Sequence, residues 1–199
     1  MKDWSKPAPP EAIERAAKAL TANGMRAIIV PDGSAAKQKL LELLPRGAEV
    51  MNMTSVTLDA IGASNAVLES GDYDPVRKKL GSADDRKKQW LGAAPEYAIG
   101  SVHAVTEDGK VFVASATGSQ LPAYAYASKV IWVVGGQKVV KDAEQAMDRI
   151  FTYVLPLEDQ RARKAYGVGS GVNKLLAFNK EAAEGRITVI LVRDEALGF

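Results

Sequence analysis

Short, almost uninterrupted apolar runs that alternate with helical segments constrain the fold of this chain more than any other feature. The runs are Arg26–Val30, Glu49–Met53, Lys129–Val134 and Ile187–Val192. Apolar stretches of about four to eight residues are typical of strands buried on both faces, as in parallel sheets. Strands that alternate with helices indicate βαβ units, whose crossovers are almost always right-handed. We therefore predict an α/β fold that is Rossmann-like, with a mostly parallel sheet flanked by helices.

Capping residues indicate where the helices begin. Pro10 suits the first position of a helix, where its missing N–H costs nothing. Ser34 is a candidate N-cap for a second helix. Asp142 and Gln145 form a capping-box pattern at the start of a late helix, and Pro156 is predicted to begin a separate polar helix after it.

The middle of the chain predicts an antiparallel hairpin. Its strands are Tyr97–Val105 and Lys110–Ser115, and the Asp108–Gly109 pair between them is a strong hairpin-turn signal. Alternation along the first strand places Ser101 and His103 on the same face. A further strand is expected over Lys174–Asn179.

Length and composition limit the class of protein. The chain has 199 residues, which predicts one domain over 1–199, with a flexible arm at 1–10 and a helical excursion at 70–94. Neither a run of eighteen apolar residues nor the apolar core of a secretory signal occurs, so we expect a cytoplasmic protein without a membrane span.

Charge and residue usage narrow the partners and cofactors. The chain has no cysteine and one histidine, which argues against disulfides, iron–sulfur clusters and a metal site within the chain. Lys+Arg 26 minus Asp+Glu 24 gives +2, without the concentrated basic face of a nucleic-acid binder. We expect no nucleic acid, no membrane and no bound cofactor; a homo-oligomer is allowed.

Four stretches rich in small and polar residues follow predicted strands, and they form the candidate binding site. Ligands of open α/β sheets bind beyond the carboxyl ends of the strands, where backbone N–H groups approach anions. Lys138 is our choice to pair with a carboxylate. The stretches are Pro31–Ser34, Asn52–Thr57, Gly118–Gln120 and Gly135–Lys138, and the candidate residues are Asn52, Thr54, Ser55, Gly118, Ser119, Gln120, Gly135, Gly136, Gln137 and Lys138.

Two residues are candidates for catalysis, each with a second interpretation. His103 serves as a base near Ser101, or it is a satisfied, partly buried histidine. Glu107 serves as base or nucleophile if its turn faces the strand ends, or it is a solvated residue at the hairpin tip. The charged residues at 77–90 similarly form a solvated helical surface or a docking arm.

The segment Gly167–Lys174 (GVGSGVNK) looks at first like a phosphate loop. It follows a helix and leads into a strand, which is the reverse of the dinucleotide fingerprint, and it lacks the Gly-Lys-Ser/Thr of the Walker pattern. We interpret it as a helix-to-strand connection. A role in closing over a site, with Asn173 or Lys174 facing inward, stays open.

Three stretches resemble the LUD domain, the lactate-utilisation family. They are LLPRGAEVMNMTSVTLDAIG, EYAIGSVHAVTEDGKVFVASATGSQLPAYAYASKVIWVVGGQKVVKD and YVLPLEDQRARKAYGVGSGVNKLL, and the resemblance spans about residues 10–199. It is greatest to the stand-alone branch, which lacks an iron–sulfur module, and the missing cysteines agree. The resemblance implies a fold similar to sugar-phosphate isomerases, glucosamine-phosphate deaminases and CoA transferases.

The same resemblance implies a site and a role. The site would be lined by Asn52–Ser55, the Glu107 turn and Gly118–Gln120. Family members often have Glu-Thr-Gly-Thr at that turn, whereas this chain has Glu107-Asp108-Gly109-Lys110. The implied role is an accessory or ligand-binding component of bacterial L-lactate oxidation to pyruvate. It would bind a small anionic ligand and act with an iron–sulfur or flavin partner protein.

Two other functions stay open at this stage. One is a self-sufficient enzyme on a phosphorylated sugar or acyl-CoA-type anion, with Glu107 as the working carboxylate. The other is an interaction protein that docks through the basic excursion.

Overall fold

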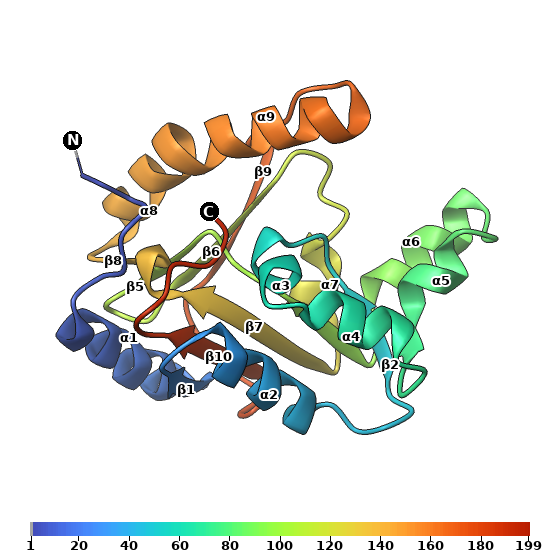
Figure 1. The fold of residues 1–199 in the computed structure, drawn as a ribbon, viewed down its shortest axis with the longest axis horizontal. Helices are drawn as coiled ribbons and strands as arrows, with labels where there is room; N and C mark the ends of the chain where they lie inside the picture. The colour runs from blue at the N-terminus through green and yellow to red at the C-terminus, as the bar shows by residue number, and fades with distance from the viewer. Residues whose placement is uncertain (1) are drawn as a thin grey trace.

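The computed structural model describes residues 2–199, which form two sheets and the helices around them (Figure 1). The larger sheet has six strands in the order β1-β10-β7-β4-β2-β3, and every neighbouring pair is parallel. Its strands are β1 (Arg26–Val30), β2 (Glu49–Asn52), β3 (Asp74–Pro75), β4 (Tyr97–Gly100), β7 (Lys129–Gly135) and β10 (Ile187–Val192). The predicted α/β fold with a mostly parallel sheet is confirmed.

The second sheet is smaller and mixed, with the order β8-β5-β6-β9. In it β5 pairs antiparallel with β6 and parallel with β8, and β6 pairs antiparallel with β9. Its strands are β5 (Ala104–Thr106), β6 (Val111–Ser115), β8 (Val139–Val140) and β9 (Lys174–Phe178). The predicted hairpin is therefore present, but only as the β5–β6 pair.

The predicted strand over 97–105 is wrong as a single strand. Its first part is β4 of the large sheet and its last part is β5 of the small sheet. The chain changes sheet at residues 101–103, so strand alternation does not relate Ser101 to His103. Gly100 lies at the change, where an added Cβ would collide with the Tyr124 hydroxyl. The apolar pattern continues across both strands because both sheets are buried there, which hides the division.

Helices cover both sheets, and their bounds differ from the predictions at two points. The N-cap of α2 is Asp32 rather than Ser34, because the Asp32 carboxylate accepts from the Ala35 N–H at 2.8 Å. The helices are α1 (Pro10–Ala22), α2 (Gly33–Leu43), α3 (Val56–Ala60), α4 (Ala63–Glu69), α5 (Val76–Leu80), α6 (Asp85–Ala93), α7 (Leu121–Tyr126), α8 (Ala143–Arg149) and α9 (Leu155–Tyr166), with a 3₁₀ turn at Gly136–Lys138.

The predicted interruption before Pro156 is also wrong. A π-helical turn (Ile150–Val154) joins α8 to α9 without a break, so the two form one long rod across the second sheet (Figure 1). Proline inside a helix lacks a donor and crowds the carbonyl four residues earlier. The wider π turn directly before Pro156 gives that ring room, and π turns of this kind are frequent at functional sites.

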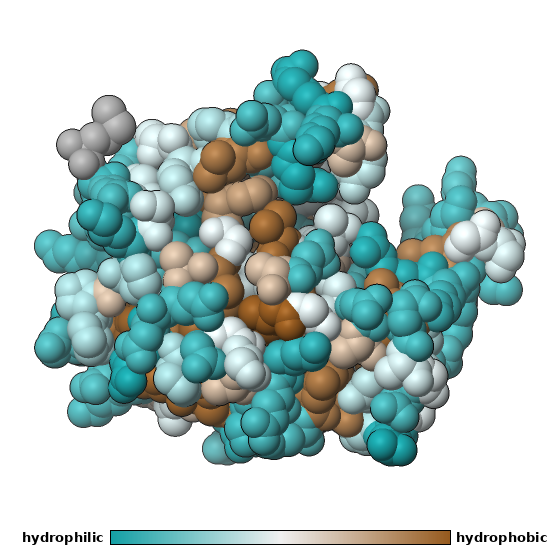
Figure 2. Space-filling model, in the orientation of Figure 1, coloured by the Kyte–Doolittle hydropathy of each residue, from teal (hydrophilic) through white to brown (hydrophobic). Residues whose placement is uncertain are grey.

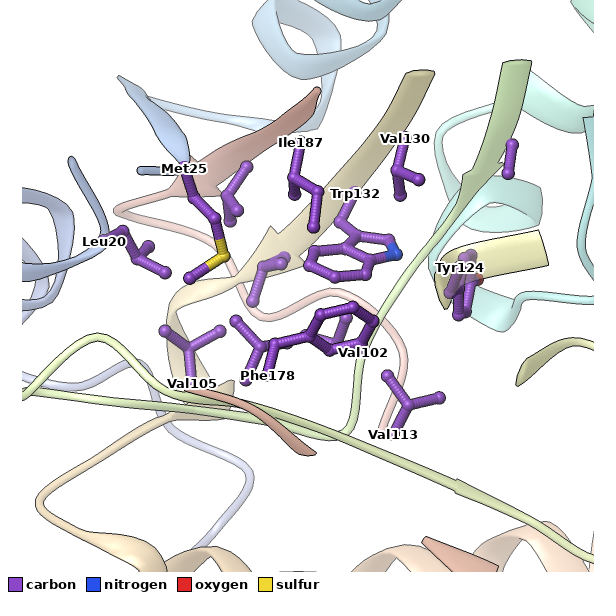
Figure 3. Close-up of a cluster of buried hydrophobic side chains, with 14 of the residues drawn as sticks. Leu20, Met25, Val102, Val105, Val113, Tyr124, Val130, Trp132, Phe178 and Ile187 are labelled. Carbon is purple, nitrogen blue, oxygen red and sulfur yellow. The ribbon is translucent and has the colours of Figure 1, made fainter. Parts of the chain in front are cut away.

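The main core lies between the two sheets. Trp132 of β7 is its centre: the ring centroids of Tyr124 and Phe178 lie 5.5 Å and 5.1 Å from it, both edge-on (Figure 3). A second cluster packs the other face of the large sheet against α2, α3 and α4 through residues such as Leu40 and Leu58. The large sheet is thus covered on both faces, as an all-parallel sheet requires.

A third cluster lies between the small sheet and α8, and Trp4 belongs to it with only 5% of its surface exposed. The Ala8 N–H also donates to the Gly136 carbonyl at 3.1 Å. The part of the predicted 1–10 arm that the structure describes is therefore packed against the protein rather than free.

Residues 70–94 contain β3, α5 and α6, and the two helices project from one side of the molecule (Figure 1). Their surface is largely hydrophilic (Figure 2), although Trp90 is 74% exposed. Among the helices of residues 2–199, none has both the length and the apolarity needed to cross a bilayer.

Candidate functional site

A cleft of about 470 Å³ opens beyond the carboxyl ends of β2 and β4. One wall comes from the loops that follow those strands, and the opposite wall comes from the α8–α9 rod and the segment after it. This is the position where open parallel sheets bind ligands, and the volume is typical of a small-molecule site.

The structure brings seven of the predicted site residues together in this cleft. They come from four separate parts of the chain: the end of β2 with the loop after it, the connection between β4 and β5, the turn after β6 and the turn after β7. The seven are Asn52, Thr54, Ser55, His103, Ser119, Gln120 and Lys138. A convergence of these loops on one cleft was predicted; Ser119 and Gln120 reach it from the second sheet rather than from the parallel one.

Lys138 is a buried lysine in the wall of the cleft, with 2% of its surface exposed. Its Nζ donates to the Thr57 hydroxyl at 2.9 Å and to the Ser101 hydroxyl at 3.0 Å. Burial, and then the neighbouring Arg149 guanidinium, hold the pKa of Lys138 well below its usual range. A bound anion would offset both effects, because an opposite charge stabilises the ammonium form.

Arg149 of α8 lies fully buried behind the cleft and ties its walls together. Its Nη1 donates to the His103 carbonyl at 2.5 Å and its Nε to the Gln137 carbonyl at 3.2 Å, while its Nη2 has no partner within residues 2–199. Burial lowers the pKa of Arg149 to about 10, so it stays charged at neutral pH. The cleft is therefore built around two buried basic residues, Lys138 and Arg149, with no carboxylate paired to either in the described part of the chain.

His103 lines the cleft as a neutral ring. Its Nδ1 accepts from the Ala114 N–H at 3.0 Å, which leaves the hydrogen of the neutral ring on Nε2. Burial first, then the positive charges of Lys138 and Arg149, lower the pKa of His103 to about 3. Such a ring donates a hydrogen bond at neutral pH but is a poor base, so a base at His103 stays unsupported by its surroundings.

Asn52 contributes a free acceptor. Its side chain is 1% exposed, it lines the cleft, and its Oδ1 has no hydrogen-bond partner among the described residues. Buried polar atoms are nearly always satisfied, so an orphaned one in a cleft wall points to a group that a ligand supplies. A hydroxyl or N–H donor is the chemistry that fits.

The rim of the cleft carries further charge. Arg77 of α5 donates to the Thr54 hydroxyl at 2.8 Å. On the opposite wall, Arg161 forms a bidentate salt bridge with Glu158, with N–O distances of 2.6 and 2.7 Å. Tyr166 lies near this pair, with the Arg161 guanidinium 5.5 Å from its ring centre.

Three predicted residues lie outside the cleft, because they contact the C-terminal segment that covers the adjoining part of the sheet edge. Gln137 donates to the Leu197 and Gly198 carbonyls at 2.9 and 3.0 Å and accepts from the Leu197 N–H at 3.2 Å. Gly135 and Gly136 make room for this contact, since an added Cβ at Gly135 would be 2.6 Å from the Leu197 nitrogen. These residues hold the C-terminal segment and do not line the cleft with the other predicted residues.

Pro31–Ser34 is also outside the cleft. The Glu195 carboxylate accepts from the Gly33 N–H at 2.8 Å, so the chain itself fills the anion position at the start of α2. Gly118 is not part of the cleft wall either; it adopts a φ of +88° and positions Ser119, which does line it.

Glu107 does not line the cleft. It borders a separate hollow of about 220 Å³ near the N-terminal segment, where it forms an ion pair with Arg15 of α1 at 2.6 Å. The turn at 107–109 packs against the end of α1 instead of the strand ends, and Asn23 donates to the carbonyls of Asp108 and Gly109. Of the two interpretations of Glu107, the one in which its turn faces the strand ends does not agree with this placement.

Several cleft residues were missed by sequence reasoning. Arg77, Glu158 and Arg161 looked like ordinary charges of solvated helices, and only the folding of their helices over the strand ends brings them to the cleft. Residues 168–172 line it as well, so the glycine-rich connection does border the site. Asn173 instead donates to the Ala116 carbonyl at 3.2 Å.

Comparisons with known proteins support this fold and identify the family of the chain. The chain is similar in structure to a DUF162 family protein from Deinococcus radiodurans, known from its crystal structure. The TM-score is 0.57 at 12% identity, covering 92% of this chain and 96% of that one. No curated protein matches the chain. The LUD domain model matches residues 13–192. Since that match covers most of its length, the chain belongs to the LUD domain family, which is associated with lactate utilisation.

Proposed function

We propose that this protein is a ligand-binding component of L-lactate utilisation that holds a small 2-hydroxy or 2-oxo carboxylate in the cleft. The observation that carries the proposal is that one cleft is lined by a buried lysine without a carboxylate partner among the described residues, Lys138, and by the unpaired acceptor Asn52 Oδ1. A bound carboxylate would hold the Lys138 amine in its ammonium form. A carboxylate needs a cationic or N–H partner, and a 2-hydroxyl needs an acceptor. L-Lactate carries both groups on adjacent carbons.

The rest of the cleft suits a ligand held beside a second molecule. Lactate would fill only part of about 470 Å³, and the remaining wall includes apolar residues of the rod such as Val154 and Leu155. Because lactate oxidation needs an electron acceptor, we propose that an iron–sulfur or flavin protein completes the site. Copurification from the native host tests this: a chain that never associates with such a protein, and whose deletion leaves growth on lactate unchanged, has another function.

The alternative of a self-sufficient enzyme that uses Glu107 has lost its support. Glu107 is paired with Arg15 outside the cleft. The carboxylate that does line the cleft, Glu158, is engaged by Arg161 through two hydrogen bonds. We therefore favour ligand binding over carboxylate catalysis.

Titration calorimetry with L-lactate, pyruvate and propionate tests the proposed ligand class. Propionate lacks the 2-oxygen, so it leaves Asn52 Oδ1 unpaired and should bind at least about tenfold more weakly than L-lactate. Asn52→Leu should weaken L-lactate binding by a similar factor while leaving propionate unaffected. Asn65→Leu, on the exposed face of α4, is the matched control. Equal affinity for L-lactate and propionate in the unaltered protein contradicts the role of Asn52.

A further inference from the structure

The surroundings of Lys138 are suited to more than charge pairing. The Thr57 hydroxyl donates to the Leu197 carbonyl at 3.0 Å, so it must accept the hydrogen bond from Lys138 Nζ. Ser101 Oγ accepts a second one at 3.0 Å. Two acceptors match the two N–H bonds of a neutral amine and leave its lone pair unused.

The charges around Lys138 favour that neutral form. The charged neighbour that acts on it is the Arg149 guanidinium of α8, and the neutral His103 ring also lines the cleft. Lys79 shows the opposite case: its Nζ pairs with Asp74 and Glu49, which raises its pKa above the usual value. A buried lysine without a carboxylate partner is the type that serves as an amine nucleophile.

We propose that Lys138 Nζ forms an imine with the carbonyl carbon of a 2-oxo acid held in the cleft. The proposal rests on the proposed function, since it concerns the oxidised member of the same ligand class. It assigns the cleft a covalent step with pyruvate-type acids that L-lactate, which has no carbonyl at C2, cannot undergo.

The chemistry balances without a further reactant. The Nζ lone pair attacks C2, the C–N bond forms, and the C=O π electrons move to oxygen. A proton passes from nitrogen to that oxygen and gives a carbinolamine. Loss of the hydroxyl with the second nitrogen proton releases one water and leaves a C=N bond, with no change of oxidation state.

The hydroxyls bonded to Nζ offer a path for those protons. Ser101 lies at hydrogen-bond distance from Nζ and lines the cleft, so it can accept one proton while donating another. The Nε2–H of His103 is a second donor on the same wall and suits the carbinolamine oxygen. Both act without changing the net charge of the cleft.

Reductive trapping tests the imine on the full chain. The protein is incubated with pyruvate and cyanoborohydride at neutral pH, and peptide mapping locates the reduced adduct. We expect Lys138 to carry at least about tenfold more adduct than any exposed lysine, because surface amines are protonated at this pH. Excess L-lactate should suppress the adduct. Lys138→Arg should abolish it, and Lys141→Arg, at the exposed neighbour, should not.

The outcomes separate the two proposals. An adduct spread evenly over exposed lysines overturns the imine, and so does the absence of an adduct when calorimetry shows pyruvate binding; the proposed function survives in both cases. An adduct on Lys138 that L-lactate does not suppress supports the imine and contradicts lactate as the ligand. If neither acid binds and nothing is trapped, both proposals fail. Because mapping is done on the unaltered protein, the result holds even if a Lys138 variant does not fold.

Discussion

The carboxyl edge of the large sheet has two halves that differ in what covers them. Beyond β2 and β4 the edge is open and forms the cleft. Beyond β1 and β10 the C-terminal segment lies over the edge, where Glu195 contacts Gly33 and Gln137 contacts Leu197. We call these two parts the open half and the closed half. Both halves offer small residues and helix N-termini. The difference therefore comes from the covering segment, and local sequence at the strand ends does not reveal it.

The boundary between the halves falls between two consecutive residues. Gln137 turns toward the closed half and satisfies the backbone of Leu197, while Lys138 turns toward the cleft. Both are buried, with about equal exposure of 2% each. One buried side chain thus stabilises the structure, and its neighbour has no carboxylate partner among the described residues.

The largest expected effect comes from disturbing the closed half. In Gly135→Ala the new Cβ would collide with the Gln137 Oε1 and lie 2.6 Å from the Leu197 backbone nitrogen. Overpacking of this kind should lower the free energy of unfolding by roughly 3 kcal/mol in urea denaturation. Gly92→Ala is the control, since its Cβ meets nothing within 4 Å and should be neutral or slightly stabilising. Equal stability of the two variants contradicts the closed packing.

Gln137→Ala tests the same half through hydrogen bonds. It removes both donors to the C-terminal carbonyls and the acceptor for Leu197 N–H. Leaving buried backbone groups unpaired should cost about 2 kcal/mol of unfolding free energy. Gln160→Ala, on the exposed face of α9, should change stability little. A loss that is no greater in Gln137→Ala than in Gln160→Ala shows that the segment is held by other contacts.

His103, which lines the open half, should make the stability of the protein depend on pH. Its pKa is about 3 in the folded protein, against 6.5 for an unperturbed histidine, so the unfolded chain binds the additional proton first as the pH falls. The contribution of His103 to stability is therefore fully present above about pH 6.5 and decreases toward acid, by about 1 to 2 kcal/mol near pH 5. Denaturation of wild type and His103→Asn across this range isolates the effect, because His103 is the one histidine of the chain. If unfolding free energy depends on pH in the same way in both proteins, the role of His103 is contradicted.

The sequence predicts the layers well because their signals are local. The apolar runs of β7 and β10 and the proline at the start of α1 specify their elements without reference to distant residues. The division of residues 97–105 between two sheets was not predictable in the same way. It depends on Tyr124, which packs against Gly100 and edge-on against Trp132, and these are contacts between segments far apart in the chain.

The cleft could be predicted only in part, because the sequence indicates the order of the strands but not which helices cover their ends. Asn52 ends one strand of the parallel sheet and Lys138 follows another, and topology alone brings both to one edge. Arg149 and Arg161 are set by where the α8–α9 rod crosses the second sheet, and a rod interrupted at Pro156 would not place them there. Glu107 was misplaced because a hairpin turn predicts its own shape and not what it faces.

The smallest expected effects on stability come from two helix N-caps, one on each half of the carboxyl edge. Asp32 caps α2 beside the closed half and Ser55 caps α3 in the cleft, accepting at 2.8 and 3.3 Å respectively. Asp32→Ala should cost about 1 kcal/mol of stability and leave ligand affinity unchanged. Ser55→Ala should cost less stability, because its bond is longer, yet weaken L-lactate binding severalfold. Calorimetry and denaturation on both variants give the test: if Asp32→Ala is the one that loses affinity, the closed half is the binding half and the two have been assigned the wrong way round.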